Sequence, residues 1–373
     1  MATNGTFILT TVGTSLLIHL RRSLSVEGLP TKQKALSQLK KTNPTEIAAG
    51  AEINSIEHLL NGMKLTTGKT FPPFELALLV SDTEDGGWTG ELLKEYYSSV
   101  RKLANVSWHK VEGLTPNDPR KFSTQGLRSL VREASKLLRE AEKKSLFRVI
   151  NATGGFKAQI SFAGLIGQTL GVPVVYLFET FPACVEMPPM PVDFDRDSWL
   201  TNYDLFTKLS NQGSMFEEEF PFNEVDPVIR DLLDSYDEAG KRLYSLSPVL
   251  ELMHQGFLAR RPRNVVEPPS SGRSNSEKIA LVRKELAHAP KGTEQFAEAM
   301  ASRFPWIIKI KNHTPKMDSA RTHLLPRKVD PGIQWACFSD GQLGVRLSIK
   351  TTCEHEGHVE YVNEALAQFL SDW

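Results

Sequence analysis

Short apolar runs alternate with helical spacings of apolar residues over the first half of the chain. Buried strands are indicated by short apolar runs with small or polar ends: Phe7–Val12, Leu76–Val80, Phe147–Ile150 and Val172–Phe178. Helices are indicated between them at Ala48–Met63, Gly90–Leu103, Gln125–Lys144 and Gly155–Leu170. Strands that alternate with helices predict an α/β domain over residues 1–200, with a doubly wound, Rossmann-like parallel sheet.

The pattern changes after Pro182, and the proline-rich segment Pro188–Pro191 closes the predicted sheet domain. Helical spacings in Asp197–Leu209 and Pro227–Tyr244 predict a helical, winged-helix-like connector over residues 201–262. The next stretch, Pro262–Ser276, is rich in Pro, Ser, Gly and Arg and is typical of a linker.

Residues 276–373 predict a small α+β domain. Helices are expected at Ser276–Ala289, Thr293–Phe304 and Val362–Leu370, and strands at Ile307–Ile310, Ile333–Phe338 and Leu343–Ile349. Asp340-Gly341 lies between the last two strands and is a strong hairpin signal.

Three predicted strands of the first domain end in small, polar residues. These ends are Gly13-Thr14-Ser15, Ser81-Asp82-Thr83 and Asn151-Ala152-Thr153-Gly154-Gly155. Ligands of doubly wound sheets bind beyond the carboxyl ends of the strands, so this edge predicts a site for a phosphorylated ligand.

The loop Asn151–Lys157 has the clearest anion-binding chemistry, because it comes directly after a predicted strand and opens a predicted helix. Its two glycines let the backbone approach a ligand, and the amides at the start of the helix point toward it. Thr153 adds a hydroxyl and Lys157 a positive charge. The alternative is an ordinary strand–helix turn with a Gly-Gly hinge.

Four segments resemble the CARF domains of CRISPR-associated effectors: Thr11–Leu17, Ala51–Ser55, Ser81–Thr83 and Asn151–Gln159. The segment Pro188–Pro191 is similar to the stretch after the sheet in one CARF subfamily. The resemblance implies a homodimer that binds one cyclic oligoadenylate, a tetramer or a hexamer, across its two-fold axis. We expect cyclic tetra-adenylate as the allosteric ligand.

The same resemblance assigns the ligand residues to two loops: Gly13, Thr14, Ser15, Asn151, Thr153, Gly154, Gly155 and Lys157. Ser81 and Asp82 are weaker candidates. Whether the domain also cuts its ligand stays open. A Rossmann dinucleotide site is poorly supported, because the first βα turn is Val-Gly-Thr-Ser and not GxGxxG.

Charge is unevenly distributed along a chain whose formal net charge is zero. Ser276–Lys350 carries thirteen Lys and Arg against seven Asp and Glu, which favours a polyanionic partner, although a solvated face is the simpler alternative. Glu217–Glu238 carries nine acidic residues and one base, which argues against DNA contact in the connector. We expect the connector to transmit the ligand signal or to hold the basic part shut.

The C-terminal part resembles RelE-type ribonucleases in the order of its elements. Leu343–Leu347 resembles the central strand of that family, and His358–Tyr361 with Asn363–Ala365 resembles its terminal segment. The resemblance implies metal-independent RNA cleavage by a 2′-hydroxyl, with ribosome-bound mRNA as the expected substrate. Arg346 would stabilise the phosphate, Tyr361 would stack on a base or assist proton transfer, and His355 or His358 would act as general acid or base.

The chain departs from the RelE pattern at the paired lysines of that family, which align with Gln334 and Ala336. The candidates to supply the missing charge are Lys309, Lys311, Arg327 and Lys328.

Three other functions compete for the second half of the chain. Arg283 and His288 satisfy the Arg-x4–6-His motif of HEPN ribonucleases, although those domains are all helical. A PD-(D/E)xK nuclease would hold Mg²⁺, but Ser348-Ile349-Lys350 lacks an acid two residues before the lysine. A non-enzymatic transcriptional regulator would use the connector as a winged helix.

Three scattered cysteines, Cys184, Cys337 and Cys353, indicate neither a disulfide framework nor a zinc site. The apolar run Phe7–Leu20 is interrupted by Thr, Gly and Ser, so it predicts neither a signal peptide nor a membrane span. We therefore expect a cytoplasmic homodimer without a cofactor, whose partners are the cyclic oligoadenylate and RNA.

Overall fold

The computed structural model describes residues 3–46, 49–178, 181–190, 199, 202–222, 225, 227–259, 265–286, 289–317, 322–325, 332–371 and 373. The chain forms two compact units. The first contains Met1–Asp193 with Glu251–Ala259, and the second contains Phe194–Leu250 with Arg260–Trp373.

A six-stranded sheet in the order β5-β4-β1-β6-β7-β8 forms the centre of the first unit. Its strands are β1 (Thr6–Thr11), β4 (Phe74–Ser81), β5 (Asn105–Val111), β6 (Phe147–Asn151), β7 (Val174–Tyr176) and β8 (Val185–Met187). All neighbours pair in parallel except β7 and β8, which are antiparallel. The central strand β1 is buried along its whole length, as its continuous apolar and threonine run requires.

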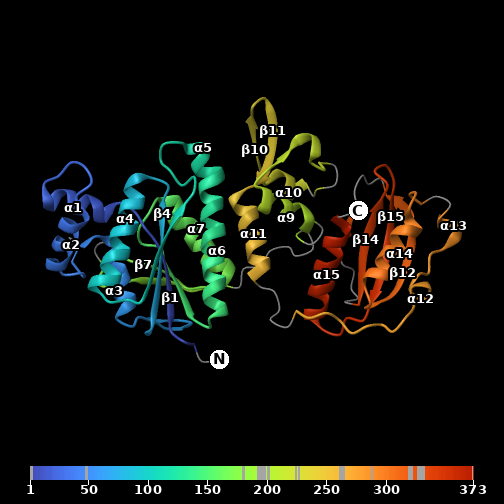
Figure 1. Cartoon of the computed structure of the whole chain (residues 1–373), viewed down its shortest axis with the longest axis horizontal. Coiled ribbons are helices and arrows are strands. Elements are labelled where there is room, and N and C mark those ends of the chain that lie inside the picture. The colour runs from blue at the N-terminus through green and yellow to red at the C-terminus, as the bar shows by residue number, and fades with distance from the viewer. Residues whose placement is uncertain are drawn as a thin grey trace. The chain divides into compact units, whose positions relative to one another are not determined.

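Helices cover both faces of this sheet (Figure 1). One face packs against α1 (Ser15–Leu24), α2 (Lys32–Lys41), α3 (Ala51–Leu60) and α4 (Glu84–Glu95). The other face packs against α6 (Leu127–Lys143) and α7 (Lys157–Leu170). Short elements complete the unit: β2 (Lys64–Leu65), β3 (Gly68–Lys69), α5 (Pro119–Lys121) and π-helical turns at Tyr96–Val100 and Phe122–Gly126. The predicted α/β fold with a parallel sheet is confirmed.

Local spacing did not predict α1, α2, β5 and β8, nor the short elements β2, β3 and α5. The strand β5 lies at the edge of the sheet and is only partly buried, so its sequence NVSWHKV lacks a long apolar run. The edge strand β8 is exposed at both ends and has the same weak signal. An edge strand has a neighbour on one side only and is partly exposed. Its sequence therefore needs fewer apolar residues, and an apolar run indicates it poorly.

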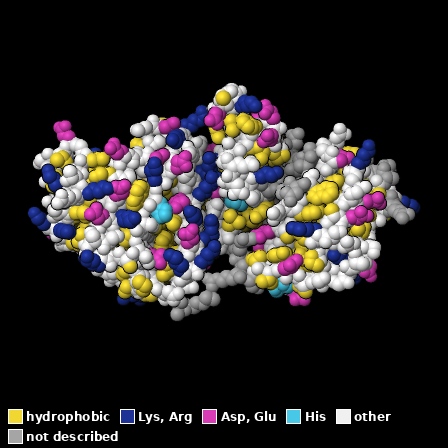
Figure 2. Space-filling model, in the orientation of Figure 1, with side chains coloured by type: hydrophobic (Ala, Val, Ile, Leu, Met, Phe, Trp, Pro, Cys, Tyr) yellow, Lys and Arg dark blue, Asp and Glu magenta, His cyan; other side chains and the backbone are white. Residues whose placement is uncertain are grey.

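The helix α11 (Pro248–Ala259) belongs to the first unit from Glu251 onward and packs beside α6. Figure 2 shows Lys and Arg side chains gathered in a band over α6, where basic residues recur every three or four positions. Two of them bind α11: Arg132 Nε lies 2.9 Å from the buried Glu251 carboxylate, and Arg139 donates a 2.6 Å hydrogen bond to Gln255. One ion pair to a buried carboxylate and one arginine–amide hydrogen bond therefore join α11 to α6.

Acid should weaken the α6–α11 contact through His254. Burial lowers the pKa of this imidazole from an ordinary 6.5 to about 4; Glu251 opposes the shift, and Arg132 and Arg139 add to it. The folded protein keeps His254 neutral while the unfolded chain binds a proton below pH 6.5. The free energy of unfolding should therefore fall as the pH drops from 6.5 toward 4, by at most about 3 kcal/mol from this group.

Urea denaturation of the wild type and of His254→Gln at several pH values in that window measures this effect. The variant should show a smaller loss of stability on acidification. An unchanged pH dependence in the variant would contradict the role of His254.

The second unit begins with α9 (Tyr203–Gln212), followed by β9 (Met215–Phe216), a 3₁₀ turn at Glu217–Glu219, and α10 (Pro227–Asp231). A hairpin of β10 (Leu233–Glu238) and β11 (Lys241–Leu246) comes next, and β11 also pairs with β9. The helix predicted over Pro227–Tyr244 is therefore wrong beyond Asp231. Ala239 and Gly240 both have positive φ, which makes the two-residue turn that favours a hairpin.

The C-terminal domain of the second unit contains a four-stranded antiparallel sheet in the order β12-β15-β14-β13. Its elements are α12 (Asn275–Lys278), α13 (Arg283–Leu286), α14 (Thr293–Arg303), β12 (Ile307–Met317), β13 (His323–Leu325), β14 (Ile333–Ser339), β15 (Gly344–Thr351) and α15 (Glu356–Ser371). The core joins α14 and α15 to one face of this sheet. Helices and an antiparallel sheet thus share one core in this part of the chain.

Two local expectations for this domain differ from the structure. The helix expected over Ser276–Ala289 is interrupted, because Ile279 forms a parallel bridge to Ile310 of β12. The last helix starts at Glu356, before the expected Val362, since its first turns are buried against the domain. Among the described residues, no helix combines the length and the apolarity needed to span a bilayer.

Candidate functional site

The loops after β1 and β6 lie against each other at the carboxyl edge of the parallel sheet. β1 pairs directly with β6, and the hydroxyl of Thr11 donates a 2.5 Å hydrogen bond to the carbonyl of Gly154. A Cβ atom on Gly13 would lie 2.6 Å from the amide nitrogen of Gly155. Only glycine allows so close an approach, and the two predicted ligand loops are therefore one structural unit.

A buried carboxylate, Glu52 of α3, holds the loop after β1. Its Oε1 accepts from the amide of Gly13 at 3.1 Å, and its Oε2 accepts from Ser15 Oγ at 2.6 Å and from the amide of Leu16 at 3.2 Å. The Ser15 hydroxyl in turn accepts from the amide of Ala51 at 3.0 Å. The Ser15 side chain is thus used to position the loop.

The side chain of Asn151 also has a positioning role. It is fully buried, its Nδ2 donates to Ser55 Oγ at 2.8 Å, and its Oδ1 accepts from the Thr153 hydroxyl at 2.7 Å. Thr153 Oγ1 also accepts from the amide of Leu177 at 3.0 Å, which ties the loop after β6 to the end of β7. These bonds satisfy the polar groups that the loop buries.

The groups of the predicted ligand residues that remain for a ligand are backbone amides, the exposed Thr14 hydroxyl and one cation. The amides of Thr14, Gly154 and Gly155 donate to no described residue, and Lys157 Nζ makes no hydrogen bond or ion pair with one. Lys157 is exposed and is the first residue of α7. Unpaired amides just before a fourteen-residue helix, with an adjacent ammonium, have the chemistry of an anion site, so this loop is the candidate site.

The loop after β4 is held by contacts with residues at the end of β5. The Asp82 carboxylate accepts a hydrogen bond from the amide of Gly113 at 3.1 Å and pairs with Lys110 at 3.2 Å. Both contacts lower the pKa of this carboxyl, and the hydrogen bond from Gly113 has the larger effect. Ser81 is buried and hydrogen-bonds Thr83 at 2.8 Å. Both side chains therefore stabilise the loop, and their hydrogen bonds are already made within the protein.

The sequence does not predict the role of Glu52, although Ala51–Ser55 is one of the four segments that resemble CARF domains. The available signal was an acid beside apolar positions of a predicted helix, but Glu57 of the same helix gives the same signal. A buried carboxylate needs several donors, and these come from a loop far away in the sequence.

The C-terminal sheet has one face covered by helices and one face rich in cations. On β15, Val345, Leu347 and Ile349 enter the core, so the alternating Arg346, Ser348 and Lys350 point to the other face. The register places β12 and β14 residues beside them. The basic face, as we call it, consists of Lys309, Lys311, His313, Trp335, Arg346, Ser348 and Lys350.

The basic face contains a polar contact between two strands. His313 lies opposite Arg346 in the ladder, and its Nε2 is 2.7 Å from Ser348 Oγ. The rings of His313 and Trp335 have centroids 4.9 Å apart. Gln334 and Ala336, which align with the lysines of the RelE family, are buried on the helix-covered side, while Lys309 and Lys311 lie on the basic face.

The structure does not bring the other predicted catalytic residues to Arg346. Tyr361 lies on α15 and packs against the core on the helix-covered face, where burial raises the pKa of its hydroxyl. His355 and His358 stack at 3.7 Å beyond the far end of β15, and burial lowers the pKa of His358. The expected arrangement of Arg346, Tyr361 and a histidine from this helix is therefore not found.

Several candidates lie outside the described residues. These are Lys328, Arg327 and His288, while Arg283 is described only in its backbone. Within the described ranges, no group of three or more His, Cys, Asp or Glu is placed to hold a metal ion.

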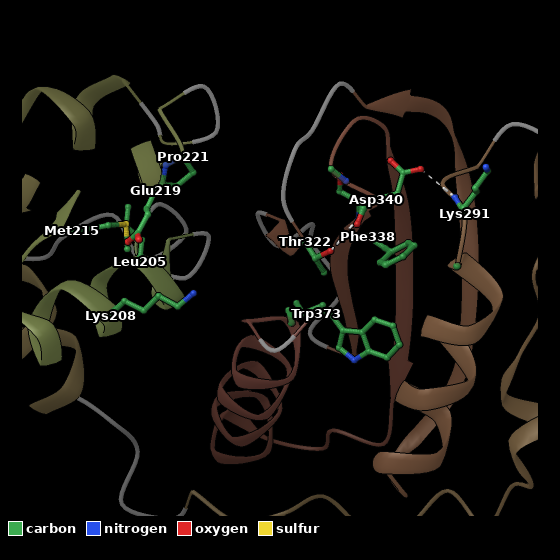
Figure 3. A pocket seen from close by; sticks show the side chains of 14 residues that line it. Leu205, Lys208, Met215, Glu219, Pro221, Lys291, Thr322, Phe338, Asp340 and Trp373 are labelled. Atoms are coloured by element: carbon green, nitrogen blue, oxygen red, sulfur yellow. Dashed lines mark hydrogen bonds between the residues drawn. The ribbon is translucent and has the colours of Figure 1, made fainter. Parts of the chain in front are cut away.

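A cavity of about 600 Å³ in the second unit contains none of the predicted catalytic residues. Figure 3 shows Lys208, Met215 and Glu219 on one wall, and Phe338, Asp340 and Trp373 on the other. Asp340 is bound by the amide of Lys291 at 3.2 Å and by the amides of its own turn. Its carboxylate therefore closes the β14–β15 turn.

Residues 47–190 match the family described as "CRISPR-associated protein (Cas_APE2256)". This span includes Glu52, Asp82 and the whole Asn151–Lys157 loop. Over that span the first unit is similar to CRISPR-associated proteins. No curated protein matches the chain.

Two solved structures are similar at low scores. Can2 from Sulfobacillus thermosulfidooxidans, solved in complex with cyclic tetra-adenylate, is 11% identical over 67% of this chain, with a TM-score of 0.26. The chain spans 62% of the length of that Can2 chain. The protein VC1899 from Vibrio cholerae is 7% identical over 98% of this chain and 85% of its own, with a TM-score of 0.24. At these TM-scores neither similarity supports a conclusion.

Proposed function

We propose that this chain is a cyclic oligoadenylate-activated ribonuclease of type III CRISPR defence, with a CARF sensor in its first unit. The observation that carries the proposal is the CRISPR-associated family match, which spans the loop with unpaired amides and Lys157. A cyclic oligoadenylate presents a ring of phosphates, and backbone amides with a nearby ammonium suit them. Cyclic tetra-adenylate is the proposed ligand.

Exposed apolar side chains in the segment from α7 to the end of β8 and beyond support the proposed homodimer. Large apolar side chains on α7 and around β7 and β8 are exposed by 40–60%: Leu165, Phe178, Phe181, Val185, Met187 and Met190. Phe178 and Phe181 have ring centroids 5.2 Å apart. Grouped apolar side chains of this size mark interaction sites, and a second copy there would bring two ligand loops to one ring.

The basic face of the C-terminal domain is the proposed RNA-binding and cleavage site. Its four cations, Lys309, Lys311, Arg346 and Lys350, match a phosphate backbone, and Trp335 offers a plane for a base. The proposed reaction is attack of a ribose 2′-hydroxyl on the neighbouring phosphate, with Arg346 stabilising the charge that develops. Cleavage of ribosome-bound mRNA in the cytoplasm is the proposed setting.

A second candidate function is non-enzymatic transcriptional regulation through the connector. The sheet order β10-β11-β9, with α9 and α10 before the hairpin, favours a winged-helix-like connector. Its hairpin carries Asp234, Asp237 and Glu238, which repel a nucleic acid backbone. The connector is therefore proposed to pass on the ligand signal.

Calorimetry with cyclic tetra-adenylate and cyclic hexa-adenylate tests the sensor, and RNA cleavage with and without the ring, ribosomes and EDTA tests the effector. We expect binding to one ring size, ring-dependent cleavage, and the same cleavage rate in EDTA. Absence of heat with both rings would overturn the sensor, and cleavage abolished by EDTA would overturn the metal-independent mechanism.

A further inference from the structure

His313 is the residue of the basic face whose chemistry the RelE resemblance leaves unused. It lies on β12, directly opposite Arg346 of β15 in the antiparallel ladder. Directly paired side chains on one face of a sheet have Cβ atoms roughly 5 Å apart. A phosphate bound by the Arg346 guanidinium would therefore be within reach of the His313 imidazole.

Two neighbours fix the orientation of this imidazole. Ser348 Oγ lies 2.7 Å from Nε2, and the ring of Trp335 lies against the imidazole at a centroid distance of 4.9 Å and an angle of 50°. Ser348 and Trp335 are themselves paired in the β14–β15 ladder. Three adjacent strands thus hold one imidazole beside one guanidinium, and rigid strands hold such groups more accurately than loops do.

We infer that His313 is the general base and general acid of the proposed RNA cleavage, with Ser348 as the residue that positions it. The inference rests on the proposed ribonuclease function. It assigns proton transfer to β12, in place of His355, His358 and Tyr361 of α15.

The step balances without a metal or a further reactant. The neutral imidazole of His313 accepts the proton of the ribose 2′-hydroxyl, and the 2′ oxygen forms a bond to the adjacent phosphorus. The bond from phosphorus to the 5′ oxygen breaks, and that oxygen leaves with the proton from the imidazolium. The products are a 2′,3′-cyclic phosphate and a 5′-hydroxyl, and the imidazole returns to its neutral form.

The geometry excludes the α15 histidines from this role. His355 and His358 lie beyond the C-terminal end of β15, whereas Arg346 is the third residue of that strand. The amides of Glu354 and Gly357 donate to the Nδ1 atoms of His358 and His355, at 3.2 and 3.1 Å, so both rings serve to cap the start of α15. In contrast, His313 shares a face and a register position with Arg346.

The test compares single-turnover RNA cleavage by ring-bound His313→Ala, His355→Ala and wild-type protein. We expect His313→Ala to cleave about 10²–10⁴-fold more slowly, as is typical for loss of an acid–base group. Added imidazole should restore part of the rate in His313→Ala, and mass spectrometry of wild-type products should find 2′,3′-cyclic phosphate ends. Ser348→Ala should lose less activity than His313→Ala and gain nothing from imidazole.

Matched controls separate chemistry from folding. His58→Ala in α3 of the first unit should cleave like the wild type, and thermal melting should place all variants within a few degrees of it. If His313→Ala cleaves at the wild-type rate, or if His355→Ala alone is inactive and rescued by imidazole, the role of His313 is overturned while the ribonuclease function stands. If wild-type protein cleaves no RNA with either ring, the proposed function and this inference both fail.

If His313→Ala unfolds, His313→Gln provides the second variant, because its amide can keep a hydrogen bond to Ser348. A folded His313→Gln protein that retains full activity would equally overturn the inference. Loss of activity with unchanged RNA affinity would support it, since removal of a proton-transfer group leaves phosphate binding in place.

Discussion

Replacing Arg346 with alanine is expected to lower ring-activated RNA cleavage by about 10²–10³-fold, the usual effect of removing one group that stabilises transition-state charge. Arg346 lies on β15 between His313 of β12 and Cys337 of β14, and it forms no ion pair with a described residue. Within the described part of the chain, no carboxylate neutralises its guanidinium charge. Single-turnover cleavage of a labelled RNA, with saturating cyclic tetra-adenylate, measures the effect.

Two variants serve as controls for Arg346. Lys284→Ala removes an exposed cation from α13 and should leave the cleavage rate unchanged, so a general loss of positive charge is not the cause. Arg346→Lys should recover only part of the rate, because an ammonium lacks the two-pronged donor geometry of a guanidinium. Full activity in Arg346→Ala, together with inactivity of His288→Ala, would favour the HEPN alternative.

Replacing Gly13 with alanine is expected to weaken cyclic tetra-adenylate binding by about 100-fold or more, the cost of two lost charge-assisted hydrogen bonds. The new Cβ would lie 2.6 Å from the amide nitrogen of Gly155 and 3.2 Å from Glu52 Oε1. Backbone must move to relieve such contacts, and the moved amides would no longer face the phosphates. Isothermal calorimetry with the ring measures the loss.

Gly28→Ala is the matched control for Gly13→Ala. A Cβ on Gly28 would meet no atom within 4 Å, so this variant should bind the ring like the wild type. Ring-activated cleavage should track binding, and Gly13→Ala should regain activity only at much higher ring concentration. Unchanged affinity in Gly13→Ala would mean that the paired loops do not form the ring site.

The candidate ring site was predictable from sequence because its signals are local. A strand that is followed by glycines and then by a helix predicts a loop with unpaired amides. Asn151–Lys157 and the residues around Gly13 both have this pattern. The roles within the loop were not predictable. Asn151, Thr153 and Ser15 carry polar groups typical of ligand contact, yet their hydrogen-bond partners are Ser55, Leu177 and Glu52, which come from distant segments.

The candidate RNA site was less accessible to sequence reasoning. Periodicity gave β14 and β15 and the hairpin between them, but it gave only the first four residues of β12. The polar stretch of β12 that ends at His313 is a strand because Lys311, Asn312 and His313 pair with β15. The strand propensities of the residues do not predict such pairing, since the hydrogen bonds join segments far apart in the chain.

The sequence alone determined the alternation of strands and helices in the first half, the glycine-rich strand–helix loop at Asn151–Lys157 and the basic character of Ser276–Lys350. These properties depend on residue types and spacing within one segment. Tertiary structure decided that Gly13 and Gly155 touch, that Glu52 holds the loop after β1, and that His313, not Tyr361, faces the side of the sheet that carries Arg346. These depend on strand order and on which face each side chain takes, and both are set by the packing of distant segments.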